Sequence, residues 1–140
     1  MTRMTTEEKQ QFLADLHVGM VAIPEPNRGP LCVPVWYDYQ PGGELWFITG
    51  PDSRKGRLLR HGLRISLCAQ TETPPYRYVS VEGPVVALDP ARDELLPMAV
   101  RYLGEAMGRE YAKGSEGEAN IVVRVRPERW LAVDYGKAQD

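Results

Sequence analysis

Apolar and polar residues alternate in short runs along most of this chain. Runs with alternating, β-branched or aromatic residues cover 20–23, 31–39, 44–49, 65–70, 77–88, 121–125 and 130–135. A period of two residues is typical of strands that bury one face, and Pro, Gly and Asn residues separate the runs as turns do. The pattern therefore predicts six or seven short strands.

Two further segments have the spacing of helices. The first starts at a capping box, Thr5-x-x-Glu8, and places an apolar stripe on Phe12, Leu13 and Leu16. The second starts at Asp89-Pro90, where Asp can cap the helix and Pro suits its first turn. Its single packing face comprises Leu96, Val100, Leu103 and Met107.

A basic segment follows the strand-like run 44–49. Asp52 or Ser53 can cap a short helix there, and Gly62 can act as its C′ residue. The segment contains five of the 17 Lys and Arg residues, namely Arg54, Lys55, Arg57, Arg60 and Arg64. A helix start with adjacent cations favours a phosphate site. The alternative is a solvated helix whose arginines pair with acids elsewhere.

Strands outnumber helices, and only one helix-length crossover separates adjacent strands. This arrangement favours a closed or partly closed antiparallel barrel, with two or three peripheral helices, over a βαβ fold. At 140 residues the chain is expected to be one domain, spanning 1–140.

Composition narrows the classes of protein. The chain is 43% hydrophobic and 26% charged, with a net charge of −2, as in ordinary globular proteins. Its cations are clustered locally, which argues against duplex DNA or an anionic membrane as partner. No apolar stretch reaches the length of a membrane span, and no apolar signal core precedes the first helix, so we expect a soluble, cytoplasmic protein. Cys32 and Cys68 lack metal-ligand spacing; we expect buried thiols and no metal site.

Two motifs resemble those of the pyridoxamine 5′-phosphate oxidase-like split-barrel superfamily, which includes FMN enzymes and enzymes that use the deazaflavin coenzyme F420. In the oxidase a strand that ends in Thr precedes an S-R-K-G segment and a short helix, which correspond here to Thr49 and residues 53–56. A later strand of the form R-Q-V-x-[IV]-E-G corresponds to residues 77–83. The motifs occur in the family's order, and the resemblance covers most of the chain.

The resemblance implies a homodimeric split β-barrel that holds two cofactors in clefts at the dimer interface. The strand 33–37 would lie along the cofactor ring, which makes Val35, Trp36 and Thr49 the ring-contact candidates. The residues that inherit the phosphate role are Ser53, Arg54 and Lys55.

Several departures from the oxidase pattern point away from pyridoxamine phosphate oxidation. The oxidases have Arg and Lys on the strand matching 33–37, Gln in place of Tyr78, and a carboxy-terminal Arg-His segment that this chain lacks. The sequence looks more like the F420-dependent branch, with FMN close behind. F420 has a polyglutamate tail, for which Arg57, Arg60 and Arg64 are candidate partners; the same arginines can equally lie over the sheet or form ion pairs across a dimer.

A cofactor of this kind transfers a hydride to a small organic substrate, and the protein orients the ring and excludes competing reactions. The hydride itself needs no side-chain acid or base, so no catalytic residue is assigned. Tyr37, Tyr76, Tyr78 and the polar loop 113–120 are candidates for shaping the substrate pocket or donating a proton, with packing as the alternative for the tyrosines. Two other classes of protein remain as alternatives to an enzyme. One is a non-catalytic flavin or haem carrier, storage or sensor protein, and the other is a nucleic-acid-binding barrel. The nucleic-acid-binding barrel is disfavoured because the aromatic and basic residues of this chain are not interleaved on one strand.

Overall fold

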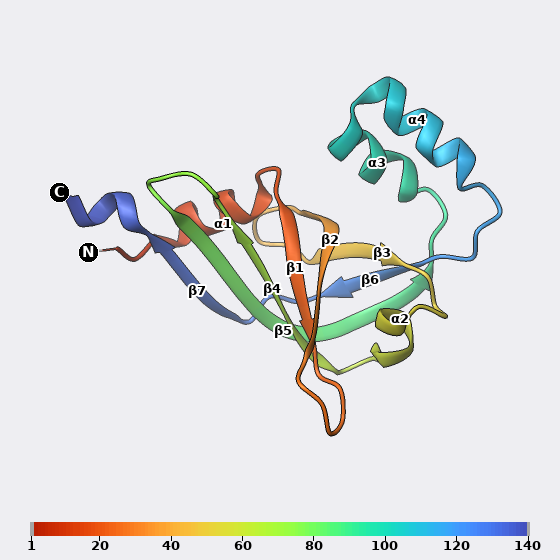
Figure 1. Ribbon diagram of the computed structural model, residues 1–140, viewed down its shortest axis with the longest axis horizontal. Helices are drawn as coiled ribbons and strands as arrows, with labels where there is room; N and C mark the ends of the chain where they lie inside the picture. Colours follow the sequence, from red (N-terminus) through yellow and green to blue (C-terminus); the bar gives the residue numbers. More distant parts are fainter. Residues whose placement is uncertain (1, 140) are drawn as a thin grey trace.

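The computed structural model describes residues 2–139, and its strands form a six-stranded antiparallel barrel with a seventh strand outside it (Figure 1). Around the barrel the order is β4, β1, β2, β3, β6, β5, and β5 pairs again with β4 to close it. The strands are β1 (Val18–Ile23), β2 (Leu31–Tyr39), β3 (Leu45–Thr49), β4 (Arg64–Gln70), β5 (Arg77–Pro90), β6 (Ile121–Val125) and β7 (Arg129–Asp134). The predicted antiparallel barrel is confirmed.

Strand β5 changes partners halfway along its length. Its first half pairs with β4 on one edge and β7 on the other, whereas its second half pairs with β6. At the change, a Cβ atom on Gly83 would lie 1.7 Å from the carbonyl oxygen of Arg126. Glycine is therefore required where the connection from β6 to β7 crosses β5. The bulge expected at Gly83-Pro84 occurs two residues later, between Val85 and Ala87.

The barrel interior is filled by alternate residues of the strands. Tyr37 is fully buried, and its hydroxyl donates a hydrogen bond of 2.7 Å to the carbonyl oxygen of Leu13. The other row of each strand faces outward, which corrects one prediction: Cys32 is exposed and Cys68 only half-buried. Both cysteines lie in apolar runs, but on the outer face of the sheet.

Within residues 2–139 there are four α-helices, more than the two or three expected: α1 (Thr6–Ala14), α2 (Arg54–Leu58), α3 (Leu95–Leu103) and α4 (Glu105–Gly114). A 3₁₀ turn, η1, covers Tyr135–Gln139. The capping box of α1 is present, but α1 ends before Leu16, which is 56% exposed rather than part of the apolar stripe. Helix α2 ends at Leu58 with Leu59 as its C-cap, so Gly62 is not its C′ residue as predicted. The N–H of Gly62 instead donates to the carbonyl oxygen of Val85 in β5.

The predicted helix from Asp89 to Met107 is wrong in its start and its continuity. Asp89 and Pro90 are the last residues of β5 and pair with β6. The helical part starts at Leu95 and is broken at Gly104, which has a φ of 84°. The result is a helical hairpin, α3–α4, that stands away from the barrel, at the upper right of Figure 1. None of the helices in the described chain combines the length and apolarity of a membrane span.

Candidate functional site

A pocket of about 460 Å³ lies where β2, the end of β3 and α2 meet the helical hairpin. Its polar side is formed by Thr49, Gly50, Ser53 and Lys55. Its apolar side is formed by Val18, Pro34, Val35, Trp36, Ile48, Leu95, Met98 and Tyr111, and its rim by Ser115, Glu118 and Asn120. A cavity of this size that combines apolar and aromatic side chains with several polar groups is typical of small-molecule sites.

Ser53 shapes the turn at the polar side. Its hydroxyl donates to the carbonyl of Gly50 at 2.7 Å, accepts from the N–H of Gly56 at 3.0 Å, and lies 3.1 Å from the hydroxyl of Thr49. A Cβ on Gly56 would lie 2.2 Å from the Gly50 carbonyl oxygen, so glycine is needed for the turn to close. The S-R-K-G motif is thus a compact turn in which the serine hydroxyl is already engaged.

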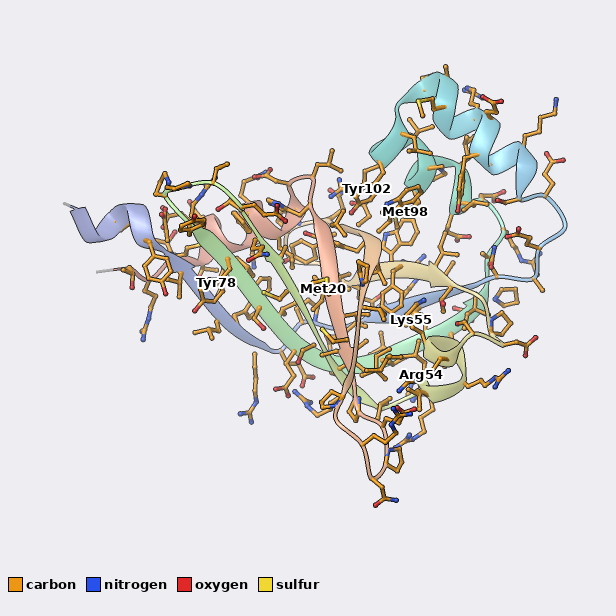
Figure 2. The ribbon with its side chains drawn as sticks, viewed as in Figure 1. Met20, Arg54, Lys55, Tyr78, Met98 and Tyr102 are labelled. Atoms are coloured by element: carbon orange, nitrogen blue, oxygen red, sulfur yellow. The ribbon has the colours of Figure 1, made fainter. Side chains whose placement is uncertain are left out.

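The cations of the basic segment separate into two groups. Lys55 is half-buried, lines the pocket and makes no ion pair with any residue between 2 and 139. Arg54 instead forms a two-pronged ion pair with Glu25 in the β1–β2 loop, with an Nε–Oε2 distance of 3.3 Å. The Arg54 guanidinium also lowers the pKa of the Glu25 carboxyl. In Figure 2, Lys55 lies nearer the hairpin than Arg54 does.

The remaining arginines lie outside the pocket. Arg64 pairs with Glu82 at 2.8 Å and with Glu128 at 2.7 Å. Arg57 lines a separate depression with Arg54, and Arg60 is exposed. Helix α2 has only five residues, so its dipole is weak and the positive charge facing the pocket comes from Lys55.

The apolar side of the pocket is built around Trp36. Its indole stacks on the ring of Tyr102, with centroids 5.1 Å apart and planes inclined by 6°. Tyr111 of α4 lies 5.5 Å from the indole at a tilt of 53°. The hairpin thus contributes Leu95, Met98 and Tyr111 to the pocket, none of which the sequence predicted. No motif marks them, and the first of them, Leu95, lies 39 residues after the end of the S-R-K-G segment.

The three tyrosines proposed from the sequence lie elsewhere. Tyr37 is in the barrel core, and Tyr76 and Tyr78 are not among the pocket-lining residues. Figure 2 shows Tyr78 toward the end of the barrel away from the hairpin, and its ring centroid lies 6.5 Å from that of Tyr135 in η1. Among the predicted ring-contact residues, Val35, Trp36 and Thr49 all line the pocket.

The described residues of the site offer neither a metal-binding cluster nor a His or Cys side chain to a haem iron, although Met98 and Tyr111 belong to the lining. Residues 2–139 bring together no group of three or more His, Cys, Asp or Glu side chains suited to a metal ion. The described lining of the pocket contains neither His nor Cys, the usual axial ligands of haem.

An apolar outer sheet face adjoins the pocket. The register places Pro34, Met20, Cys68, Ser80 and Leu131 in one row across five strands. Val18, Met20 and Leu131 on this face are large, exposed apolar residues. Because Val18 and Pro34 also line the pocket, the outer sheet face and the pocket share an edge.

Comparison with known proteins agrees with this fold. The family model described as pyridoxamine 5′-phosphate oxidase matches residues 5–134. Among curated proteins, none matches the chain with significance.

Three solved structures illustrate the similarity. A conserved hypothetical protein from Mycobacterium tuberculosis is 23% identical, with a TM-score of 0.79 over 99% of this chain and 90% of that one. An F420 reductase is 21% identical, with a TM-score of 0.69 over 87% of this chain and 94% of that one. An FAD-binding protein from Mycobacterium smegmatis is 16% identical, with a TM-score of 0.62 over 94% of this chain and 97% of that one. At these identities the structural likeness shows the fold alone.

Proposed function

The chain belongs to the pyridoxamine 5′-phosphate oxidase family, and from this premise we propose that it is an oxidoreductase that binds F420, with FMN as the close alternative. The observation that carries the proposal is that the half-buried Lys55 and the indole of Trp36 line the same pocket. A cation without an ion pair in the described chain suits a phosphate, and a flat indole suits a planar ring.

The proposed binding mode divides the pocket between phosphate and ring. The Lys55 ammonium would hold the phosphate, while the Ser53 hydroxyl keeps the turn closed. Val35, Trp36 and Thr49 would flank the ring. When bound, such a cofactor supplies hydride chemistry: its reduced ring is oxidised, and the organic substrate gains the hydride and then a proton from water.

F420 is favoured over FMN by the positive charge beyond the pocket. Arg57 and Arg60 are exposed and make no ion pair with a described residue, so both are available to an anionic tail. Arg64 is not, because Glu82 and Glu128 engage it. Among structures of the same fold, the F420 reductase supports the deazaflavin, whereas the FAD-binding protein supports a flavin.

We propose in addition that the protein is a homodimer with the cofactor at its interface. The outer sheet face is apolar and nearly uncharged around Met20, and it borders the pocket at Val18 and Pro34. A second copy seated there would bury the exposed apolar residues and cover the open side of the pocket. Sedimentation equilibrium should then give twice the mass of the chain.

Titration with F420 and, separately, with FMN tests the proposal. Wild type should bind one of them with micromolar or better affinity, and Lys55→Ala should weaken binding by about 30-fold, since it removes a charge-assisted contact. Lys9→Ala on α1 is the matched control and should bind like wild type. Arg57→Ala should weaken F420 but not FMN. If wild type binds neither, the proposal fails.

Turnover separates an enzyme from the alternative of a carrier or sensor. An enzyme oxidises its reduced cofactor faster when a reducible organic substrate, such as a quinone or a nitroaromatic compound, is added. A carrier binds the cofactor with the same dependence on Lys55 but shows no such acceleration. A haem carrier is less well supported, because the described pocket lining contains no His or Cys.

A further inference from the structure

The hydrogen-bond ladder between β1 and β2 ends where the side chain of Tyr102, from α3, lies between the two chain segments. The last ladder pair is Val18 with Trp36, and the next in register would be His17 with Tyr37. There the Tyr102 hydroxyl accepts a hydrogen bond from the N–H of Tyr37 at 3.0 Å and lies 2.5 Å from the carbonyl oxygen of His17, to which it donates. One phenol thus bridges two backbone groups that would otherwise pair directly.

Arg101 reinforces this attachment. Its guanidinium donates to the carbonyl oxygens of Ala14, Asp15 and Tyr37, each at 3.1 Å, and lies 3.5 Å from the carboxylate of Asp38. In the described chain, Arg101 and Tyr102 make all the hydrogen bonds that run from α3 and α4 to β2 and to residues 14–17, which connect α1 with β1. The helical hairpin is therefore fastened to the barrel through two adjacent side chains.

The same fastening sets one side of the pocket. The Tyr102 ring lies flat against Trp36, and the hairpin that it secures supplies Leu95, Met98 and Tyr111 to the pocket. Figure 2 shows Met98 and Tyr102 together at the base of the hairpin. If the hydroxyl contact is lost, the Tyr37 N–H and the His17 carbonyl lose their partner, and the attached position of the hairpin is destabilised.

We propose that Tyr102 is a positioning residue that holds the helical hairpin and Trp36 in place as a wall of the pocket. It touches no ligand itself, since it lies behind the indole and does not line the pocket. The identity of the ligand rests on the proposed function, but the positioning role does not.

Hydrogen exchange of the ligand-free protein tests the positioning role. Tyr102→Phe keeps the ring and removes the hydroxyl; the control is Tyr76→Phe, an exposed tyrosine outside the pocket. Amides of residues 95–114 should exchange about tenfold faster in Tyr102→Phe, whereas amides of β4 and β5 keep their wild-type rates. Unchanged rates in 95–114, or equal acceleration in β4 and β5, would overturn the proposal.

Binding gives a second readout. Tyr102→Phe should weaken F420 or FMN binding by about five- to tenfold and alter the visible circular dichroism of the bound ring, while Tyr76→Phe changes neither. If wild type binds neither cofactor, the proposed function fails and the exchange experiment still decides the role of Tyr102. If wild type binds a cofactor but Tyr102→Phe leaves both its affinity and its dichroism unchanged, the positioning role is rejected and the proposed function stands.

If Tyr102→Phe does not fold, Arg101→Lys tests the same attachment of the hairpin, because it leaves the hydrogen bonds of the Tyr102 hydroxyl intact. It keeps the charge but loses the fork that reaches three carbonyl oxygens, so exchange in 95–114 should again accelerate relative to β4 and β5. Wild-type exchange in that variant would contradict a hairpin fastened through these two side chains.

Discussion

The barrel and the helical hairpin are held together in different ways. Each barrel strand is hydrogen-bonded to neighbours on both sides, and the interior is filled by fully buried residues such as Val21, Tyr37 and Phe47. The hairpin packs mainly on itself, where Gly108 crosses Val100, and is fastened to the barrel through Arg101 and Tyr102. A stable framework therefore presents one side of the pocket, and a more weakly attached element presents the other.

The largest expected effect comes from the barrel side of this comparison. Gly83→Ala places a methyl group 1.7 Å from the Arg126 carbonyl oxygen, so the crossing of β5 by the β6–β7 connection must move. We expect a loss of about 3 kcal/mol or more in the free energy of unfolding, measured by urea denaturation. Gly114→Ala, in open space at the end of α4, is the control and should change stability by less than about 1 kcal/mol. Similar stability of the two variants would mean that the crossing adapts readily.

An intermediate effect is expected within the hairpin. In Gly108→Ala the new methyl group would lie 2.6 Å from the backbone of Val100, which forces α3 and α4 apart. We expect about 1–2 kcal/mol of destabilisation, with faster hydrogen exchange confined to residues 95–114. Accelerated exchange in the barrel as well would show that the two regions unfold together.

The smallest effect concerns pH at the junction of the two regions. His17 packs against the ring of Phe12, and its Nε2 atom is buried with no partner in the described chain. Burial lowers the pKa of His17 below its usual 6.5; Arg77 and Arg101 lower it further and Asp15 opposes them. As the pH falls, His17 therefore takes up its proton at a higher pH in the unfolded chain than in the folded protein. The free energy of unfolding should decrease below about pH 6.5 as a result.

His17→Phe removes this titration. The difference in unfolding free energy between pH 7.5 and pH 5.5 should shrink, by less than about 1 kcal/mol, relative to wild type. Urea denaturation of both proteins at the two pH values measures it. An unchanged pH dependence would assign the effect to other groups.

The sequence predicted the barrel well because alternation is a local signal of one-sided burial. The strands β2 and β6 have the bounds expected from their apolar runs. The helix predicted at Asp89 failed for a non-local reason, since Asp89 and Pro90 pair with Val122 and Ile121 some 30 residues away. The local preference of Asp89-Pro90 for a helix start is outweighed by the pairing with β6, which extends β5 to Pro90.

The site was predictable only where residues adjacent in sequence form it. The S-R-K-G turn and the strand around Trp36 were found because each is a short contiguous motif. The roles of Arg54 and Lys55 could not be separated from sequence, because Glu25, the partner of Arg54, lies 29 residues earlier. The hairpin side of the pocket was missed because a tertiary contact, the stacking of Trp36 on Tyr102, brings it there.

The pairing of Arg54 with Glu25 has a consequence for the selectivity of the pocket among anions. With Arg54 engaged, the charged side chains of the described lining are Lys55 and Glu118, and their charges cancel. A phosphate dianion bound there would meet one ammonium group, so much of its charge must be balanced by solvent or by residues of a neighbouring molecule. If the proposed cofactor binds there, its selection over other compact anions would rest less on net charge than on the fit of its ring against the indole of Trp36.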